Sequence, residues 1–174
     1  MGNMRNIVVV PYDPAWPERY RQEAAALASI LGPELVAIHH IGSTAVPGLS
    51  AKPVIDILPV VRDVGTLDPF HPALIALGYE PRGENGIPGR RFFSKGTDGH
   101  RTHHVHAFGV GHAEIARHLD MRDYLIAHPE EALQYASLKI ELAKQYPHDI
   151  LGYMAGKDAF IKEVLMKAGE WRAA

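Results

Sequence analysis

Residues 39–57, HHIGSTAVPGLSAKPVIDI, connect two predicted strands through a loop that contains a Gly-Ser pair. The segment 34–43, ELVAIHHIGS, is short, apolar and partly β-branched, which predicts a strand that runs into this pair. Residues 52–61, KPVIDILPVV, predict a second strand, and this strand carries a single carboxylate, Asp56. The order of strand, Gly-Ser loop and carboxylate strand is the starting point for the fold assignment.

The Gly-Ser loop has two interpretations. Glycine lets the backbone come close to a phosphate, so the N–H groups after Gly42 can point at its oxygens, and the hydroxyls of Ser43 and Thr44 add donors. Glycine and serine are also ordinary residues of turns. The loop is therefore either an anion-binding site, in which Gly42, Ser43 and Thr44 contact phosphate, or a plain turn.

The rest of the chain predicts a mixed sheet followed by helices. We expect a short strand over 6–12, a helix over 13–32 with Asp13 as its N-cap, a helix over 66–78, a strand from 79, a hairpin of 90–96 and 101–108 joined by four residues, and helices from 111 onward. No repeat or linker divides the chain, so we expect one domain, 1–174, with a sheet-forming part, 1–110, and a helical part, 111–174. The predicted fold class is α/β, of the α+β type.

Composition narrows the chemistry that is available. The 174 residues include eleven histidines and no cysteine, so a metal site must use histidine and carboxylate ligands. The net charge of −2, with both signs interspersed, argues against a nucleic-acid partner and leaves a small anionic ligand open. The apolar run near the N-terminus spans only four residues, too few for a signal peptide or a membrane span, so we expect a cytoplasmic protein with no membrane contact.

Four motifs, in order along the chain, resemble the signature of the GrpB family, which is grouped by fold with the DNA polymerase beta-like nucleotidyltransferases. They are HHIGSTAVPGLSAKPVIDIL at 39–58, HVH at 104–106, MRDYLIAHPEEALQYASLK at 121–139 and YMAGKDAFI at 153–161. The resemblance implies a nucleotidyltransferase-like fold, in which flanking helices surround a mixed β-sheet and the C-terminal third is helical. It also implies a nucleotide ligand and transfer at phosphorus.

One strand departs from the superfamily pattern. Catalytic members carry two acidic residues two positions apart after the Gly-Ser loop, and a third on a neighbouring strand, and these hold two magnesium ions. In PVIDIL, Val54, Asp56 and Leu58 share one face, so neither position beside Asp56 supplies a second carboxylate. The resemblance therefore supports the fold more strongly than the reaction.

The histidine-rich strand offers a different set of metal ligands. In RTHHVHAF, His104 and His106 lie on one face, roughly 7 Å apart along the strand, so both rings can converge on one ion. The fold resemblance puts Asp56 on an adjacent strand, which gives two histidines and one carboxylate, with His40 as a fourth candidate. Imidazole ligands favour zinc, manganese, cobalt or nickel over magnesium. The alternative is a polar histidine cluster without a metal.

Three cationic side chains complete the predicted site. Lys52 is placed to contact an anion in the loop and joins Asp56 as a catalytic candidate. Arg91, in the hairpin, and Lys139, on a predicted helix, are candidates for phosphate contacts. Each of the three is alternatively a solvated or structurally paired charge.

Two functions follow from these residues. The first is metal-assisted binding of a nucleotide or another phosphorylated small molecule, with nucleotidyl or phosphoryl transfer. The second is a non-catalytic ligand-binding domain that has lost the acidic pair. The sequence assigns neither an acceptor nor an oligomeric state.

Overall fold

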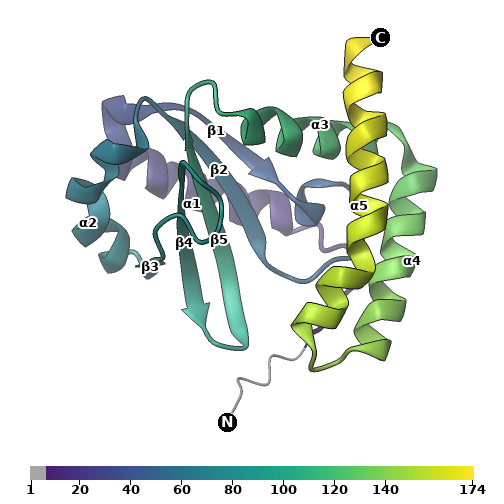
Figure 1. Cartoon of the computed structure of the whole chain (residues 1–174). Coiled ribbons are helices and arrows are strands. Elements are labelled where there is room, and N and C mark those ends of the chain that lie inside the picture. The colour runs from purple at the N-terminus through teal and green to yellow at the C-terminus, as the bar shows by residue number, and fades with distance from the viewer. Residues whose placement is uncertain (1–6) are drawn as a thin grey trace.

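A computed structural model describes residues 7–174, and its centre is a five-stranded mixed sheet (Figure 1). The strands are β1 (Leu35–Ile41), β2 (Ile55–Val61), β3 (Tyr79–Pro81), β4 (Arg90–Thr97) and β5 (His100–Gly109), in the order β1-β2-β5-β4-β3. Strands β2 and β5 are parallel, and the other neighbouring pairs are antiparallel. The strands on either side of the Gly-Ser loop are therefore neighbours in one sheet, as predicted.

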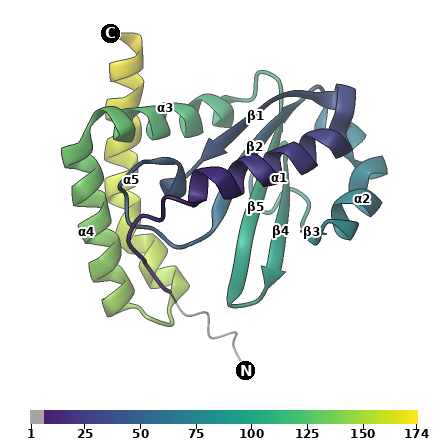
Figure 2. The same ribbon diagram turned by 180° about the vertical axis from the view of Figure 1, so that it is seen from behind.

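Helices cover both faces of this sheet. They are α1 (Trp16–Leu31), α2 (His71–Ala76), α3 (Ala113–Ala127), α4 (Pro129–Gln145) and α5 (Ile150–Ala173), with short 3-10 turns η1 (Gly32–Glu34), η2 (Ser43–Ala45) and η3 (Val64–Phe70). Helix α1 lies across one face (Figure 2), where Leu27 packs in a cluster with Ile57. Leu119 of α3 packs on the other face, against the cluster that contains Leu58. Successive residues of β2 thus contact opposite layers, because side chains alternate along a strand.

The first helix begins and ends close to its predicted positions. The carboxylate of Asp13 accepts a hydrogen bond from the Ala15 N–H at 2.8 Å, and α1 begins at the next residue. The chain leaves the helix at Gly32, whose φ of +54° is easily reached by glycine. Gly32 therefore marks the end of this helix, whereas the N-cap is Ala15 and not Asp13, whose side chain closes the turn before the helix.

The strand predicted over 6–12 is wrong for the part that the structure describes. Residues 7–12 form only an isolated bridge between Val10 and Ala51, and residue 6 lies outside the described residues. The N–H of Ile7 donates to the carbonyl of Pro147, 3.1 Å away, and its side chain packs in a cluster with α4 and α5. The start of this segment therefore packs on the helical part, whereas Val10 and Tyr12 pack against the core cluster that contains Ile57 of β2.

Two other elements differ in detail from their predictions. The helix predicted over 66–78 is divided into η3 and α2, because two closely spaced prolines lack the N–H that a continuous α-helix needs. The β4–β5 hairpin is confirmed, but Asp98 and Gly99 alone connect its strands instead of four residues. Asp-Gly is a preferred two-residue hairpin turn, and Gly99 has a φ of +85°.

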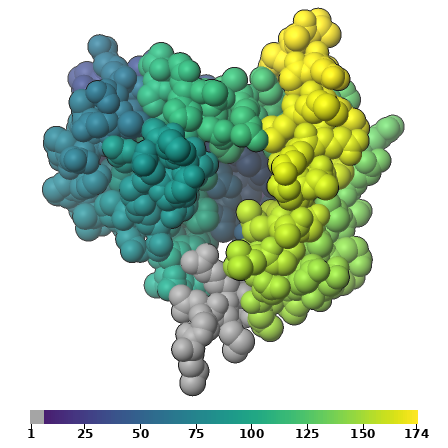
Figure 3. Space-filling model, viewed as in Figure 1, coloured from purple at the N-terminus to yellow at the C-terminus, as the bar shows by residue number. Residues whose placement is uncertain are grey.

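The C-terminal helices do not all pack on the sheet. Helix α3 does, whereas α4 and α5 share a separate apolar cluster with α3 and with Val46 and Leu49 of the loop after β1. The space-filling view shows a recess between the sheet part and the yellow helix α5 (Figure 3). Between residues 7 and 174, no helix is both long and apolar enough to cross a membrane.

Candidate metal and phosphate site

A cavity of about 440 Å³ lies between the sheet and the C-terminal helices. The sheet side contributes the Gly-Ser loop, Asp56 of β2, and His104 and His106 of β5. Helices α3, α4 and α5 contribute, among others, His118, Arg122, Tyr135, Lys139, Tyr153 and Lys157. Most of the polar residues predicted from sequence therefore line one cavity.

The predicted metal ligands converge on the sheet side. Asp56 is level with His104 in the parallel β2–β5 pair, so the side chains of Asp56, His104 and His106 project from the same face. One Asp56 oxygen, Oδ1, lies 3.0 Å from His106 Nε2 and 3.6 Å from His104 Nδ1. Ligand atoms of all three lie within 4.8 Å of one another. The group forms a possible metal site of two imidazoles and one carboxylate, a set that fits a borderline divalent ion.

Hydrogen bonds fix the protonation of this group. Burial alone would raise the pKa of Asp56, but the interactions with His104 and His106 outweigh it and hold the pKa below its usual range. The guanidinium of Arg90, which can only donate, faces His106 Nδ1 at 3.3 Å. The Nε2–H of His106 therefore donates to Asp56, and binding of an ion at Nε2 requires the proton to leave that nitrogen.

The arginine on this side is Arg90 and not Arg91. Arg90 pairs with Phe108 across the hairpin and Arg91 with Ala107, so Arg90 shares the face of His106 while Arg91 points to the opposite face. The expectation that Arg91 reaches the site is therefore corrected. The alternation of the two arginines was visible in the sequence, but the face that meets the cavity depends on the pairing of β5 with β2.

The Gly-Ser loop lies directly against Asp56. Gly42 has φ +74° and ψ −173°, and a Cβ at this position would lie 2.6 Å from Asp56 Oδ2. Ser43 and Thr44 follow in η2, and both line the cavity. The hydroxyl of Thr44 is buried and lies 2.9 Å from His40 Nε2. Glycine is required at position 42 both by its backbone conformation and by the closeness of the carboxylate.

The structure does not bring His40 to the metal group. Ile41 is level with Asp56 in the β1–β2 pair, so His40 projects to the opposite face, where its ring stacks on Tyr20 at 4.7 Å. Burial lowers the pKa of His40 to about 4, with Arg122 adding to the effect and Asp56 opposing it. His40 is therefore neutral, and it supports the loop through Thr44.

The helical side of the cavity is rich in buried cations. Lys139 is 2% exposed, and in the described part of the chain its Nζ has no hydrogen-bond partner. Burial lowers the pKa of Lys139 to about 7, helped by Lys157 and Lys52. Burial also lowers the pKa of Lys157 to about 8, again helped by Lys52. Nζ of Lys52 lies 5.5 Å from the ring centroid of Tyr153, whose buried hydroxyl lacks a partner among residues 7–174.

Five polar residues that line the cavity were not among the predicted site residues: His118, Arg122, Tyr135, Tyr153 and Lys157. Tyr153 and Lys157 are separated by four positions, and this helical spacing was the available signal. No sequence pattern indicated His118 as a site residue, because its position depends on how α3 lies on the sheet. Burial lowers the pKa of His118 to about 4, with His106 adding to the effect.

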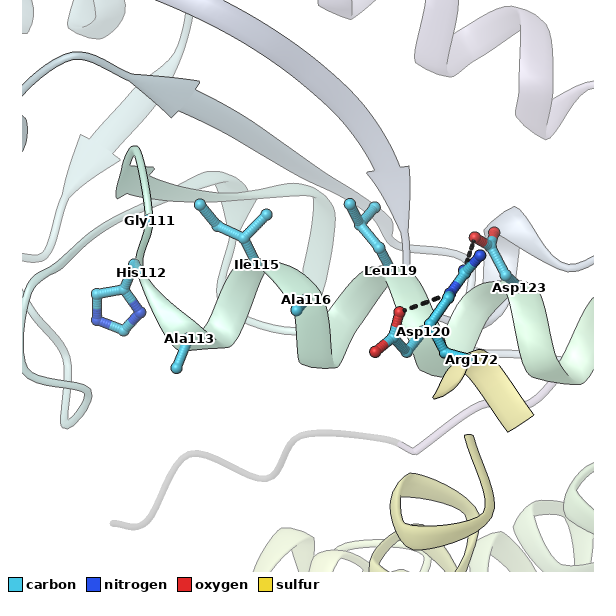
Figure 4. Close-up of a pocket in the computed structure, with 9 residues that line it drawn as sticks. All are labelled: Gly111, His112, Ala113, Ile115, Ala116, Leu119, Asp120, Asp123 and Arg172. Carbon is cyan, nitrogen blue, oxygen red and sulfur yellow. Dashed lines mark hydrogen bonds and ion pairs between the residues drawn. The ribbon is translucent and has the colours of Figure 1, made fainter. Parts of the chain in front are cut away.

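A second hollow lies between α3 and the end of α5 (Figure 4). Its charged side chains neutralise one another, because Arg172 donates to both Asp120 and Asp123. Ile115 and Leu119 supply its apolar surface. Neither the converging histidines nor the buried lysines line this hollow, so it is not the candidate site.

The fold is nucleotidyltransferase-like. A sequence model of the family described as "GrpB protein" matches residues 6–167, and the chain belongs to this family. It is 46% identical over 168 residues to "UPF0157 protein YqkA" of Bacillus subtilis; the match covers 97% of this chain, which spans about half (49%) of that relative.

Solved structures agree with this assignment. "Conserved protein GrpB from Enterococcus faecalis" matches with a TM-score of 0.92 and 42% identity, over 96% of this chain and 100% of that one. "Terminal uridylyl transferase 4 from Trypanosoma brucei with bound CTP" matches with a TM-score of 0.53 and 14% identity, over 92% of this chain and 52% of that one. The second likeness shows a shared fold.

Proposed function

We propose that this protein binds a nucleotide or another phosphorylated small molecule together with a divalent metal ion. One observation carries the proposal: Asp56, His104 and His106 converge on the sheet side of a cavity whose helical side contains the buried Lys139 and Lys157. A phosphate ester that is bound through a metal ion needs ligands for the metal and positive charges for its other oxygens. The two sides of this cavity offer both.

Asp56, His104 and His106 are the proposed metal ligands. Two imidazoles suit zinc, manganese, cobalt or nickel better than magnesium, which prefers oxygen ligands. A bound ion would polarise a phosphoryl oxygen as a Lewis acid. The lack of a second carboxylate at Val54 and Leu58 argues against two magnesium ions.

The proposed phosphate contacts come from the helices and the loop. The buried Nζ of Lys139 lies 4.5 Å from the ring centroid of Tyr135 but has no hydrogen-bond partner within residues 7–174, and this supports an anionic ligand. Lys157 and the hydroxyl of Tyr153 lie in the same cavity, and Lys52 adds positive charge from the loop after β1. Gly42 and Ser43 offer backbone and hydroxyl donors on the sheet side.

The bound CTP of the structural relative supports a nucleotide as the ligand. Transfer at phosphorus is the reaction proposed for an active form, with Asp56 and Lys52 as catalytic residues. The missing acidic pair favours the second candidate, a domain that binds the ligand without turnover. Incubation with metal and nucleoside triphosphates distinguishes the two candidate functions. Released phosphate or pyrophosphate supports transfer, and binding without release supports the second candidate.

The metal site is tested by titration calorimetry with Zn²⁺ and Mg²⁺. We expect tighter binding of Zn²⁺, and loss of that binding in the double variant His104→Ala/His106→Ala. The control is His100→Ala/His148→Ala, which removes two exposed histidines. A double variant at 104 and 106 that binds Zn²⁺ like the control refutes the metal site.

The phosphate site is tested with inorganic triphosphate and ATP. Lys139→Met is expected to weaken binding of both, whereas Lys144→Met, which changes an exposed lysine on the same helix, leaves it unchanged. Equal affinities in the two variants refute the role of Lys139.

A further inference from the structure

His118 lies beside the metal group although it belongs to a different layer of the fold. It projects from α3, its ring lines the cavity, and its ring centroid is 5.8 Å from that of His106. The rings of His104 and His106 are farther apart, at 6.3 Å. Bonds of roughly 2.1 Å from each imidazole to one ion hold the two ring centroids about 5 to 6 Å apart. The centroid separation of His106 and His118 therefore lies within the range for shared ligation, although among the described residues the ligand atoms that already lie within 4.8 Å of one another belong to Asp56, His104 and His106, so a turn of the His118 ring is needed.

The two nitrogens of His118 have different surroundings. Nε2 is enclosed by protein, makes no hydrogen bond within the described residues, and lies 3.7 Å from Oε2 of Glu114, one helical turn earlier. The other oxygen of Glu114 accepts a hydrogen bond from Arg117 at 2.7 Å, which orients the carboxylate. Because Nε2 is enclosed on the Glu114 side, Nδ1 is the nitrogen available to the cavity.

This arrangement matches a recurrent feature of histidine ligands. A histidine that binds a metal through one nitrogen directs its other N–H to a carboxylate, a carbonyl or water, and the acceptor fixes the tautomer and the ring orientation. Glu114 is placed to be that acceptor for His118. His106 differs in this respect, because its second nitrogen, Nδ1, faces the guanidinium of Arg90 at 3.3 Å.

We infer that His118 is a fourth protein ligand of the metal proposed above, bound through Nδ1, and that Glu114 positions it by accepting the Nε2–H. This inference rests on the proposed metal site. It makes the site a junction between the sheet and α3, with three donors from β2 and β5 and one from the helix. Four protein donors bind an ion more tightly than three and leave fewer positions for water.

The test compares metal affinities of the full-length protein by competition with a chelator. His118→Ala is expected to weaken Zn²⁺ and Co²⁺ binding at least about tenfold. His71→Ala is a closely matched control, because Nε2 of His71 is also enclosed, has no hydrogen-bond partner among residues 7–174 and lies 3.7 Å from a carboxylate one turn earlier, but His71 does not line the cavity. The control is expected to bind like the wild type.

The absorption of bound Co²⁺ supplies a second measurement. Its visible bands are stronger with four ligands than with five or six, so His118→Ala should change their intensity and position, whereas a purely structural role for His118 would leave the spectrum of the bound fraction unchanged. Glu114→Ala should lower the affinity, and Glu114→Gln, whose amide oxygen can still accept the Nε2–H, should restore most of it.

The outcomes are distinguishable. A wild type that binds no transition metal overturns both the proposed function and this inference. Metal binding that is lost in His104→Ala/His106→Ala but unchanged in affinity and spectrum in His118→Ala overturns the inference alone. If His118→Ala does not fold, as judged by thermal unfolding, His118→Gln fills similar space and carries the same expectation.

Discussion

Gly42→Ala should destabilise the protein by an amount that depends on Asp56. The backbone at Gly42, with φ +74° and ψ −173°, lies in a region that is almost confined to glycine. The added Cβ would lie 2.6 Å from Asp56 Oδ2 and 3.3 Å from Asp56 Cβ. The carboxylate cannot move away freely, because its other oxygen accepts a hydrogen bond from His106 at 3.0 Å.

The magnitude has two parts. A residue forced into this backbone region costs about 1–3 kcal/mol, and overpacking against a fixed group costs about 1–3 kcal/mol more. Gly42→Ala should therefore lower the free energy of unfolding by about 4 kcal/mol, which corresponds to a fall in Tm of about 10 °C for a chain of this size. Movement of the Asp56 carboxylate should also weaken any metal binding at the site.

Urea unfolding followed by circular dichroism measures this loss. Gly48→Ala is the control, because Gly48 also has a positive φ, +80°, but its added Cβ meets open space. The control should lose only the backbone part, about 1–3 kcal/mol. In an Asp56→Ala background the loss from Gly42→Ala should fall toward that of the control. Equal losses for the two glycines, or a loss that Asp56→Ala does not reduce, would refute the argument.

Two further predictions concern Arg90, which faces His106, and Lys139, which lines the cavity. Arg90→Gln should bind Zn²⁺ about tenfold more tightly, because the donor facing His106 Nδ1 is replaced by an amide that can accept its proton; calorimetry that gives weaker binding contradicts this. Lys139→Met should stabilise the protein at pH 6, since it removes a buried charge whose pKa is lowered to about 7. The gain should shrink toward pH 9, where the native lysine is already neutral while the unfolded one is still protonated. Urea unfolding at both pH values, with Lys144→Met as control, tests this; a gain independent of pH contradicts it.

The sequence allowed much of this architecture to be predicted. The Gly-Ser loop between two strands indicated that β1 and β2 are neighbours, and alternation along β5 correctly put His104 and His106 on one face. These features are local, because they depend on one loop and on the period of a strand.

The features that the sequence did not determine depend on how elements pair. His40 was a metal candidate, but the level of Ile41 with Asp56 turns it to the other face. Arg91 instead of Arg90 was predicted at the site. The prediction was wrong because the face of β4 that meets the cavity depends on how the whole sheet pairs. His118 reaches the site only through the packing of α3.

The parallel pairing of β2 with β5 has a consequence for folding. Asp56 and His106 are 50 positions apart, and a parallel pair requires a long crossover between its strands, here the segment that includes β3 and β4. In an unfolded chain, or in one whose strands β2 and β5 have not yet paired, Asp56 lies far from the two histidines. An ion captured by Asp56, His104 and His106 would therefore bind the native state more tightly than the unfolded chain, where only the two histidines remain close together, and the difference in binding free energy would add to the stability of the native state.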